Sequence, residues 1–134
     1  MKHRVLFIDD DVITIECAAT HLELSGHEVH ICSDITNALA RLRFEDFTVV
    51  FLDVMLPPED QFDLSETVDG RYTGLRVIER VFEDPKFEKA RASKWIIITN
   101  WRDEPEVDAV AEARGVQILR KPLSIDQIEE VISS

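Results

Sequence analysis

The sequence contains little cysteine and no long hydrophobic segment. Cys17 and Cys32 are the only cysteines among its 134 residues, too few for the disulfide framework of a small secreted domain, so we expect reduced thiols. No stretch approaches the roughly 20 apolar residues that a membrane-spanning helix needs. The apolar segment at residues 5–8 is too short for a signal peptide, and three aspartates follow it. These absences predict a cytoplasmic protein without a membrane segment.

Basic residues are also scarce. The chain has 15 lysines and arginines against 27 aspartates and glutamates, which gives a net charge of −12. A surface this acidic repels the phosphates of nucleic acids and of anionic lipids, so we expect the chain to bind neither nucleic acid nor a membrane. For the same reason, chemistry on a phosphate group needs a local cation in this protein.

The apolar residues fall into short blocks that predict five strands. Hydrophobic residues make up 45% of the chain, and its length suits one domain over residues 1–134. The predicted strands are residues 5–8, 29–32, 49–52, 95–98 and 116–119. Three of them are nearly continuous in hydrophobicity, which is typical of strands buried on both faces of a parallel sheet.

Helical patterns lie between and after these strands. The spacing of Ile35, Ala38, Leu39 and Leu42 is one example. Asp103 followed by Pro105 predicts the beginning of another helix. A strand followed by a helix, five times over, predicts an α/β fold, a flavodoxin-like (βα)5 doubly wound parallel sheet with strand order 2-1-3-4-5.

One segment does not fit a short connection. Residues 57–73 read PPEDQFDLSETVDGRYT, which is long for a loop between a strand and a helix and carries five acidic residues. Long loops in compact domains are usually functional or disordered. Residues 57–73 are therefore predicted to be an insertion that forms an extended loop after the third strand. The sequence is compatible either with a solvated loop or with a specific functional site there. A second irregular stretch, residues 86–94, is expected to contain a short helical turn.

Polar residues stand at the ends of four predicted strands. Asp9 and Asp10 follow the first strand, Asp53 ends the third, Thr99 ends the fourth and Lys121 ends the fifth. In open parallel sheets, ligands bind beyond the carboxyl ends of the strands, at the point where the strand order reverses. In the order 2-1-3-4-5 that point lies between the first and third strands. The three carboxylates are therefore expected to meet there.

Carboxylates held this close repel one another unless a cation joins them. A hard divalent ion with oxygen ligands relieves that repulsion, and Mg²⁺ is the expected ion where phosphate is also handled. Lys121 provides a point charge for a phosphoryl oxygen, and Thr99 provides one hydrogen-bond donor. Such a set of groups stabilises an in-line phosphoryl transfer, in which positioning and charge neutralisation carry most of the catalysis.

Four motifs, taken in order, resemble those of the response-regulator receiver domains of two-component systems. They are VLFIDDD, VVFLDVMLP, IIITN and ILRKP. The resemblance covers essentially the whole chain. It implies a phosphoacceptor signalling domain rather than an enzyme with a separate substrate. A histidine kinase or a phosphotransfer protein is implied as the donor, and a switch in protein–protein interactions as the output.

The resemblance also implies a role for each matching residue. Asp53 corresponds to the aspartate that takes the phosphoryl group. Asp9 and Asp10 correspond to the acidic pair that holds Mg²⁺, with Asp53 and the backbone carbonyl of Met55 as further ligands. Thr99 and Lys121 correspond to the residues that contact the phosphoryl group. The peptide bond between Lys121 and Pro122 is expected to be cis.

The chain departs from the family pattern in three places. The insertion delays the helix that follows the phosphoacceptor strand until about Gly74. Ile118 stands where the family often has an aromatic switch residue. Asn100 and Trp101 follow Thr99, where a small residue and then a variable one are usual. Phosphorylation is expected to be preserved, while Ile118 leaves the usual threonine–aromatic coupling an open question.

Two alternatives remain open. The order Asp9-x-Asp11 after a first strand is similar to that of haloacid-dehalogenase-type phosphatases, in which Asp9 would be the nucleophile and Asp11 the acid and base. That interpretation leaves Asp53 without a role, and Asp11 is better placed to cap the first helix. The other alternative is a receiver-like binding module whose output does not depend on phosphorylation.

Overall fold

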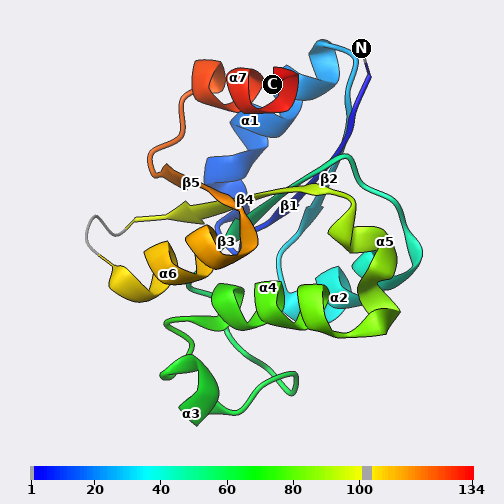
Figure 1. Ribbon diagram of the computed structural model, residues 1–134. Coiled ribbons are helices and arrows are strands. Elements are labelled where there is room, and N and C mark those ends of the chain that lie inside the picture. The colour runs from blue at the N-terminus through cyan, green and yellow to red at the C-terminus, as the bar shows by residue number, and fades with distance from the viewer. Residues whose placement is uncertain (1, 101–103) are drawn as a thin grey trace.

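The computed structural model describes residues 2–100 and 104–134. Five strands form one parallel sheet in the order β2-β1-β3-β4-β5, so the predicted order is confirmed (Figure 1). The strands are β1 Arg4–Ile8, β2 Glu28–Cys32, β3 Val49–Asp53, β4 Lys94–Thr99 and β5 Gln117–Arg120. The fifth begins one residue later than predicted, because the N–H of Val116 donates to the carbonyl of Ala111 in a turn (2.9 Å).

Helices cover both faces of the sheet (Figure 1). One face packs against α1 Val12–Leu24 and α7 Ile125–Ser133. The other packs against α2 Ile35–Phe44, α4 Thr73–Glu83, the short η1 Pro85–Phe87 and α5 Glu88–Arg91, and α6 Pro105–Arg114. Side chains alternate between these faces along each strand, since successive residues of a strand point to opposite sides. Phe7 and Phe51 accordingly stack on the α1 side, with ring centroids 4.7 Å apart.

Both irregular segments contain helical residues. The second stretch, residues 86–94, includes the predicted helical turn as parts of η1 and α5. The insertion was expected to be a loop, but it contains a short helix, α3 Leu64–Thr67. Glu66 stabilises the start of α3, because its carboxylate accepts a hydrogen bond from the N–H of Asp63 (3.2 Å).

The residue found directly before α6 is not the predicted cap residue. Asp103, the predicted cap, lies outside the described residues. The structure places Glu104 directly before α6 and Pro105 in the first turn. The Glu104 side chain does not cap the helix; it instead accepts hydrogen bonds from Tyr72 and Arg71.

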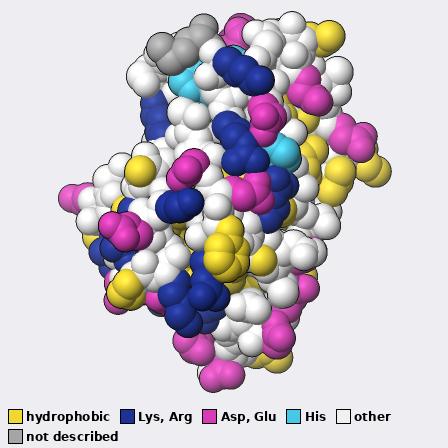
Figure 2. All heavy atoms as spheres, turned by 90° about the vertical axis from the view of Figure 1, so that its right-hand side faces the viewer, with side chains coloured by type: hydrophobic (Ala, Val, Ile, Leu, Met, Phe, Trp, Pro, Cys, Tyr) yellow, Lys and Arg dark blue, Asp and Glu magenta, His cyan; other side chains and the backbone are white. Residues whose placement is uncertain are grey.

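Charged side chains of both signs mix on the surface near β2. Figure 2 shows basic, acidic and histidine side chains interspersed on this face. Arg4 pairs there with Glu28 and Glu45, each at 2.5 Å. In the described ranges, 2–100 and 104–134, no helix combines the length and the apolar character that crossing a bilayer requires.

Gly74 brings the first turn of α4 against the end of β3. Its N–H donates to the carbonyl of Val54 (2.8 Å). A Cβ at this position would lie 2.8 Å from Val54 Cα and closer still to the carbonyl oxygen of Asp53. Both neighbours are backbone atoms, which cannot move without shifting β3. The strand end that carries Asp53 is therefore fixed by a residue without a side chain.

We expect Gly74→Ala to lower the free energy of unfolding by roughly 1–3 kcal/mol, the usual effect of overpacking a rigid site, and to shift the amide resonances of Asp53 and Val54. Denaturant unfolding and NMR spectra measure the two effects. Gly26→Ala is the control for the spectra: its φ of 97° makes alanine costly there, but no atom lies within 4 Å of the added Cβ, so the resonances of Asp53 and Val54 should stay in place. Unchanged stability and spectra in Gly74→Ala would contradict this packing argument.

Candidate functional site

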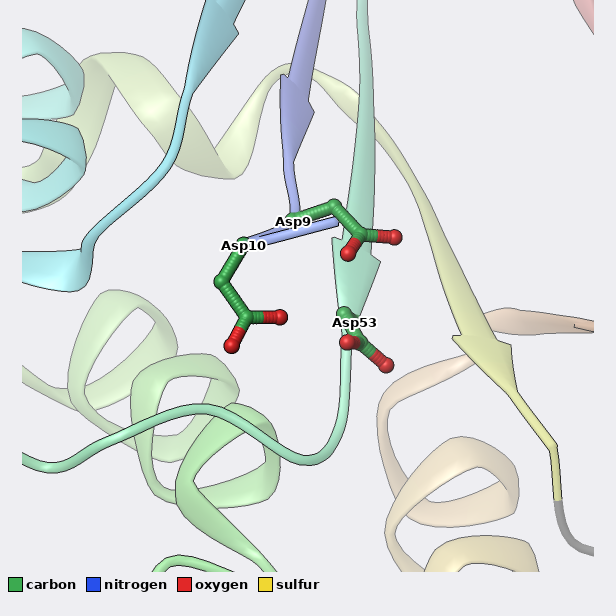
Figure 3. Close-up of side chains that lie close together, drawn as sticks. All are labelled: Asp9, Asp10 and Asp53. Carbon is green, nitrogen blue, oxygen red and sulfur yellow. The ribbon is translucent and has the colours of Figure 1, made fainter. Parts of the chain in front are cut away.

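Three carboxylates converge beyond the carboxyl ends of β1 and β3 (Figure 3). Asp9 follows β1 and is fully buried, Asp53 is the last residue of β3 and is 6% exposed, and Asp10 is exposed. One carboxylate oxygen from each of the three lies within 4.8 Å of the others. The structure thus brings together the acidic residues that the sequence placed at these strand ends.

Lys121 approaches two of these carboxylates from β5. Its ammonium nitrogen lies 3.0 Å from Asp9 Oδ2 and 3.5 Å from Asp53 Oδ2. Its backbone N–H donates to the carbonyl of Thr99 (2.8 Å), which holds the ends of β4 and β5 together. The bond between Lys121 and Pro122 is cis, as predicted.

A cavity of about 560 Å³ opens over this group. Thr99, the last residue of β4, is buried and lines it, as does Asn100. Met55 also lines it, with a side chain that is half exposed. Trp101 lies outside the described residues, and Ile118 is partly buried at the position where the family often has an aromatic residue.

Asp11 has a structural role. It is the N-cap residue of α1, and its carboxylate accepts hydrogen bonds from the N–H of Thr14 (3.4 Å) and from its hydroxyl (2.6 Å). The expected helix cap is therefore confirmed. The N–H of Asp11 also donates to Asp9 Oδ1 (2.9 Å), so it orients the buried carboxylate.

The electrostatics of the cavity favour a cation. Burial and the negative charge of Asp9 raise the pKa of Asp53 to about 7, although the ammonium of Lys121 opposes the shift. Burial by itself lowers the pKa of Lys121, but Asp53 and Asp9 outweigh it and the net shift is upward. One ammonium thus faces two buried carboxyl groups.

The donor set fits a hard divalent ion. Asp9 Oδ2 is buried and accepts no well-directed hydrogen bond from the described residues, with the ammonium of Lys121 at 3.0 Å as its ion-pair partner. That one ammonium is shared with Asp53, so a further positive charge would stabilise the buried carboxyl groups. Three carboxylates around one space offer the oxygen ligands that Mg²⁺ prefers.

The insertion supplies part of the cavity wall. Pro57, Pro58, Asp69 and Gly70 line the cavity together with Asp53. Sequence reasoning placed the insertion beside the site but did not single out Asp69. The only local signal was Gly70, which favours an unusual backbone conformation for the residues around it.

The family model for the response regulator receiver domain matches residues 5–133. The chain belongs to the response regulator receiver domain family. Phosphorylation by a kinase is the function of this family, and a receiver domain is a phosphoacceptor signalling unit. This membership, together with the capping role of Asp11, decides against the phosphatase alternative.

Individual relatives agree with this family. This chain is 27% identical over 89 residues to the alkaline phosphatase synthesis transcriptional regulatory protein PhoP of Bacillus subtilis. The match covers 66% of this chain and 37% of PhoP. The chain spans about half, or less, of the length of the curated relatives it matches.

Solved structures share the fold. A CheY-like receiver domain protein from Methanospirillum hungatei superposes with a TM-score of 0.76 at 22% identity, covering 99% of this chain and 92% of that one. A response regulator from Burkholderia pseudomallei, described with a phosphorylated aspartic acid, a calcium ion and citrate, gives a TM-score of 0.73 at 21% identity. The match covers 97% of this chain and 66% of that one.

The raised pKa of Asp53 predicts a pH-dependent cost of folding in metal-free protein. Because the pKa rises from 3.8 to about 7 on folding, stability is lost as the pH rises through this interval. Asp53→Asn removes the effect. We expect its stability advantage over the wild type to grow between about pH 4 and pH 7, to roughly 2–4 kcal/mol at about 1.4 kcal/mol per pKa unit.

Urea unfolding at several pH values in the presence of a chelator measures this difference. Asp126→Asn is the matched control, because it makes the same charge change on the exposed first turn of α7. A constant difference between Asp53→Asn and the wild type across this interval would contradict the predicted shift.

Proposed function

We propose that residues 1–134 form one receiver domain in which Asp53 is phosphorylated in a Mg²⁺-dependent reaction. The observation that carries the proposal is the convergence of Asp9, Asp10 and Asp53 within 4.8 Å, with the ammonium of Lys121 at 3.0 and 3.5 Å from two of them. The phosphorylated aspartic acid and calcium ion of the Burkholderia pseudomallei relative support it.

The donor is a phosphohistidine of a histidine kinase or a phosphotransfer protein. A carboxylate oxygen of Asp53 attacks the phosphorus, the bond from phosphorus to the donor imidazole nitrogen breaks, and that nitrogen takes up a proton. The product is an acyl phosphate on Asp53. The low exposure of Asp53 restricts the reaction to a donor that enters the cavity.

Mg²⁺ neutralises charge on the phosphoryl group when it is bound. Asp9 and Asp10 would hold it, with the carboxylate of Asp53 and the backbone carbonyl of Met55 as further ligands. Lys121 pairs with a phosphoryl oxygen. That oxygen then occupies the position beside the ammonium that the Asp53 carboxylate has in the unphosphorylated protein. The Thr99 hydroxyl donates a hydrogen bond to another phosphoryl oxygen.

These contacts exist only in the phosphorylated state and therefore shift the population toward it. The output face is formed by α6, β5 and α7, where Ala109 and Ala113 are exposed on α6. An unidentified partner protein binds there. A cytoplasmic location is part of this proposal, and the free thiols of Cys17 and Cys32 support it.

A receiver-like module with phosphorylation-independent output is the second candidate. Ile118 favours it, because isoleucine offers neither the size nor the hydroxyl of an aromatic switch residue. In this case Asp53 still takes up the phosphoryl group, but α6 and β5 do not respond to it.

We expect acetyl phosphate with Mg²⁺ to add one phosphoryl group to the wild type, at Asp53, and none to Asp53→Asn. The reason is that an amide is too weak a nucleophile to form the acyl phosphate. Intact-mass measurement followed by peptide mapping locates the group. Asp126→Asn is the control and labels like the wild type. Label that persists in Asp53→Asn would sink the assignment.

Beryllofluoride with Mg²⁺ separates the two candidates. As a phosphoryl mimic on Asp53 it is expected to shift the amide resonances of Thr99 and Lys121 and, through them, those of α6 and β5. If the shifts stop at the cavity, the output does not depend on phosphorylation and the second candidate is correct.

Mg²⁺ alone is expected to raise the melting temperature of the wild type by binding only the folded site. Asp9→Asn and Asp10→Asn lose most of this increase, because each removes a charged ligand. Asp126→Asn keeps it. Thermal unfolding at increasing Mg²⁺ concentration measures the effect, and equal increases in all four proteins would place the ion elsewhere.

A further inference from the structure

A buried carboxylate ties the end of the insertion to the start of α6. Glu104 is 8% exposed. Its Oε2 accepts a hydrogen bond from the hydroxyl of Tyr72 (2.8 Å), and its Oε1 lies 2.9 Å from Nη2 of Arg71. These hydrogen bonds, first that of Tyr72 and then that of Arg71, lower the pKa of Glu104, so it is ionised at neutral pH. Hydrogen bonds to an ionised group are among the strong ones in proteins.

The residues just before this bridge have a left-handed backbone conformation, which is strained at Val68. Val68, Asp69 and Gly70 have positive φ angles of 53°, 56° and 89°. For a branched residue such as valine this conformation costs about 1–2 kcal/mol, and it persists only where the surroundings enforce it. Thr67 contributes to that, because its hydroxyl accepts from the N–H of Gly70 (3.0 Å) and its carbonyl from the N–H of Tyr72 (2.8 Å).

The two residues that follow Val68 form part of the wall of the cavity. Asp69 and Gly70 line the same cavity as Asp53 and Lys121. Gly70 lies close to the backbone that follows β3, since a Cβ there would be 3.2 Å from the carbonyl oxygen of Leu56. The wall is therefore near the site of the proposed acyl phosphate, and the bridge begins at the next residue along the chain.

We propose that Tyr72 and Arg71, through Glu104, are positioning residues that hold residues 68–70 as a wall against water. The inference rests on the proposed phosphorylation of Asp53. In hydrolysis, the oxygen of a water molecule bonds to phosphorus and the bond from phosphorus to the Asp53 carboxylate oxygen breaks. The protons of the water leave with inorganic phosphate or pass to solvent. Without the bridge, the strip at residues 68–70 relaxes from its strained conformation and admits more water.

The lifetime of the acyl phosphate tests this role. Wild type, Tyr72→Phe and Glu104→Ala are labelled with acetyl phosphate and Mg²⁺, the donor is removed, and loss of the group from Asp53 is followed by mass spectrometry. We expect both variants to lose it roughly tenfold faster, the lower end of what the loss of a hydrogen bond to an ionised group gives. Glu104→Gln retains an acceptor for Tyr72 and is expected to lie closer to the wild type.

Arg114→Gln is the matched control. It breaks the pair between Arg114 and Glu83 (3.1 Å) at the other end of α6. Its acyl-phosphate lifetime is expected to equal that of the wild type. The same shortening in Arg114→Gln would overturn the inference, because general loosening of α6 would then explain the result.

Hydrogen exchange separates this inference from the function on which it rests. The amides of Gly70 and Tyr72 are expected to exchange faster in Tyr72→Phe than in the wild type, while the affinity for Mg²⁺ stays unchanged. Equal lifetimes in proteins that do label at Asp53, or unchanged exchange in the strip, overturn the inference alone. A wild type that takes no label at Asp53 overturns the proposed function and the inference with it.

Discussion

The burial of Asp9 and Asp53 beside a single ammonium is the constraint on which the site depends. Two carboxyl groups and one lysine leave negative charge in the interior, and burial together with the charge of Asp9 raises the pKa of Asp53. A divalent cation would offset this charge, and a phosphoryl group on Asp53 would need the cation still more, because it adds negative charge. The metal-free fold is thus less stable than its core alone would make it.

The insertion is a folded part of the molecule with three points of attachment. Glu59 accepts hydrogen bonds from the N–H and the hydroxyl of Thr36, at the start of α2 (3.0 and 2.7 Å). Arg80 of α4 donates to the carbonyl of Gln61 (2.7 Å). Glu104 provides the third attachment, before α6. The acidic insertion is therefore held against the body by these polar contacts and also by the packing of Phe62 and Tyr72 with the hydrophobic core.

The sheet could be predicted because each strand is marked by a run of apolar residues that are adjacent in the sequence. Continuous apolar runs identified the buried strands, and right-handed crossovers left few possible orders. The same logic brought Asp9, Asp53 and Lys121 to one edge. The short helix α3 was missed, because four residues are too few to show a periodic pattern. The bridge from Tyr72 to Glu104 was also missed, since its partners are 32 residues apart and no local pattern links them.

The hydrogen bond from Gly74 to the carbonyl of Val54 has a consequence for the ancestry and engineering of this chain. Because of this hydrogen bond, a residue before the insertion and the residue after it lie close together in the fold. Lengthening a loop whose ends already meet costs little, about 0.6 kcal/mol for each doubling of its length. The length of the segment between them can thus change at small cost while the strand that carries Asp53 stays in register, as long as the buried Leu56 and the contacts of Arg71 and Tyr72 with Glu104 are kept.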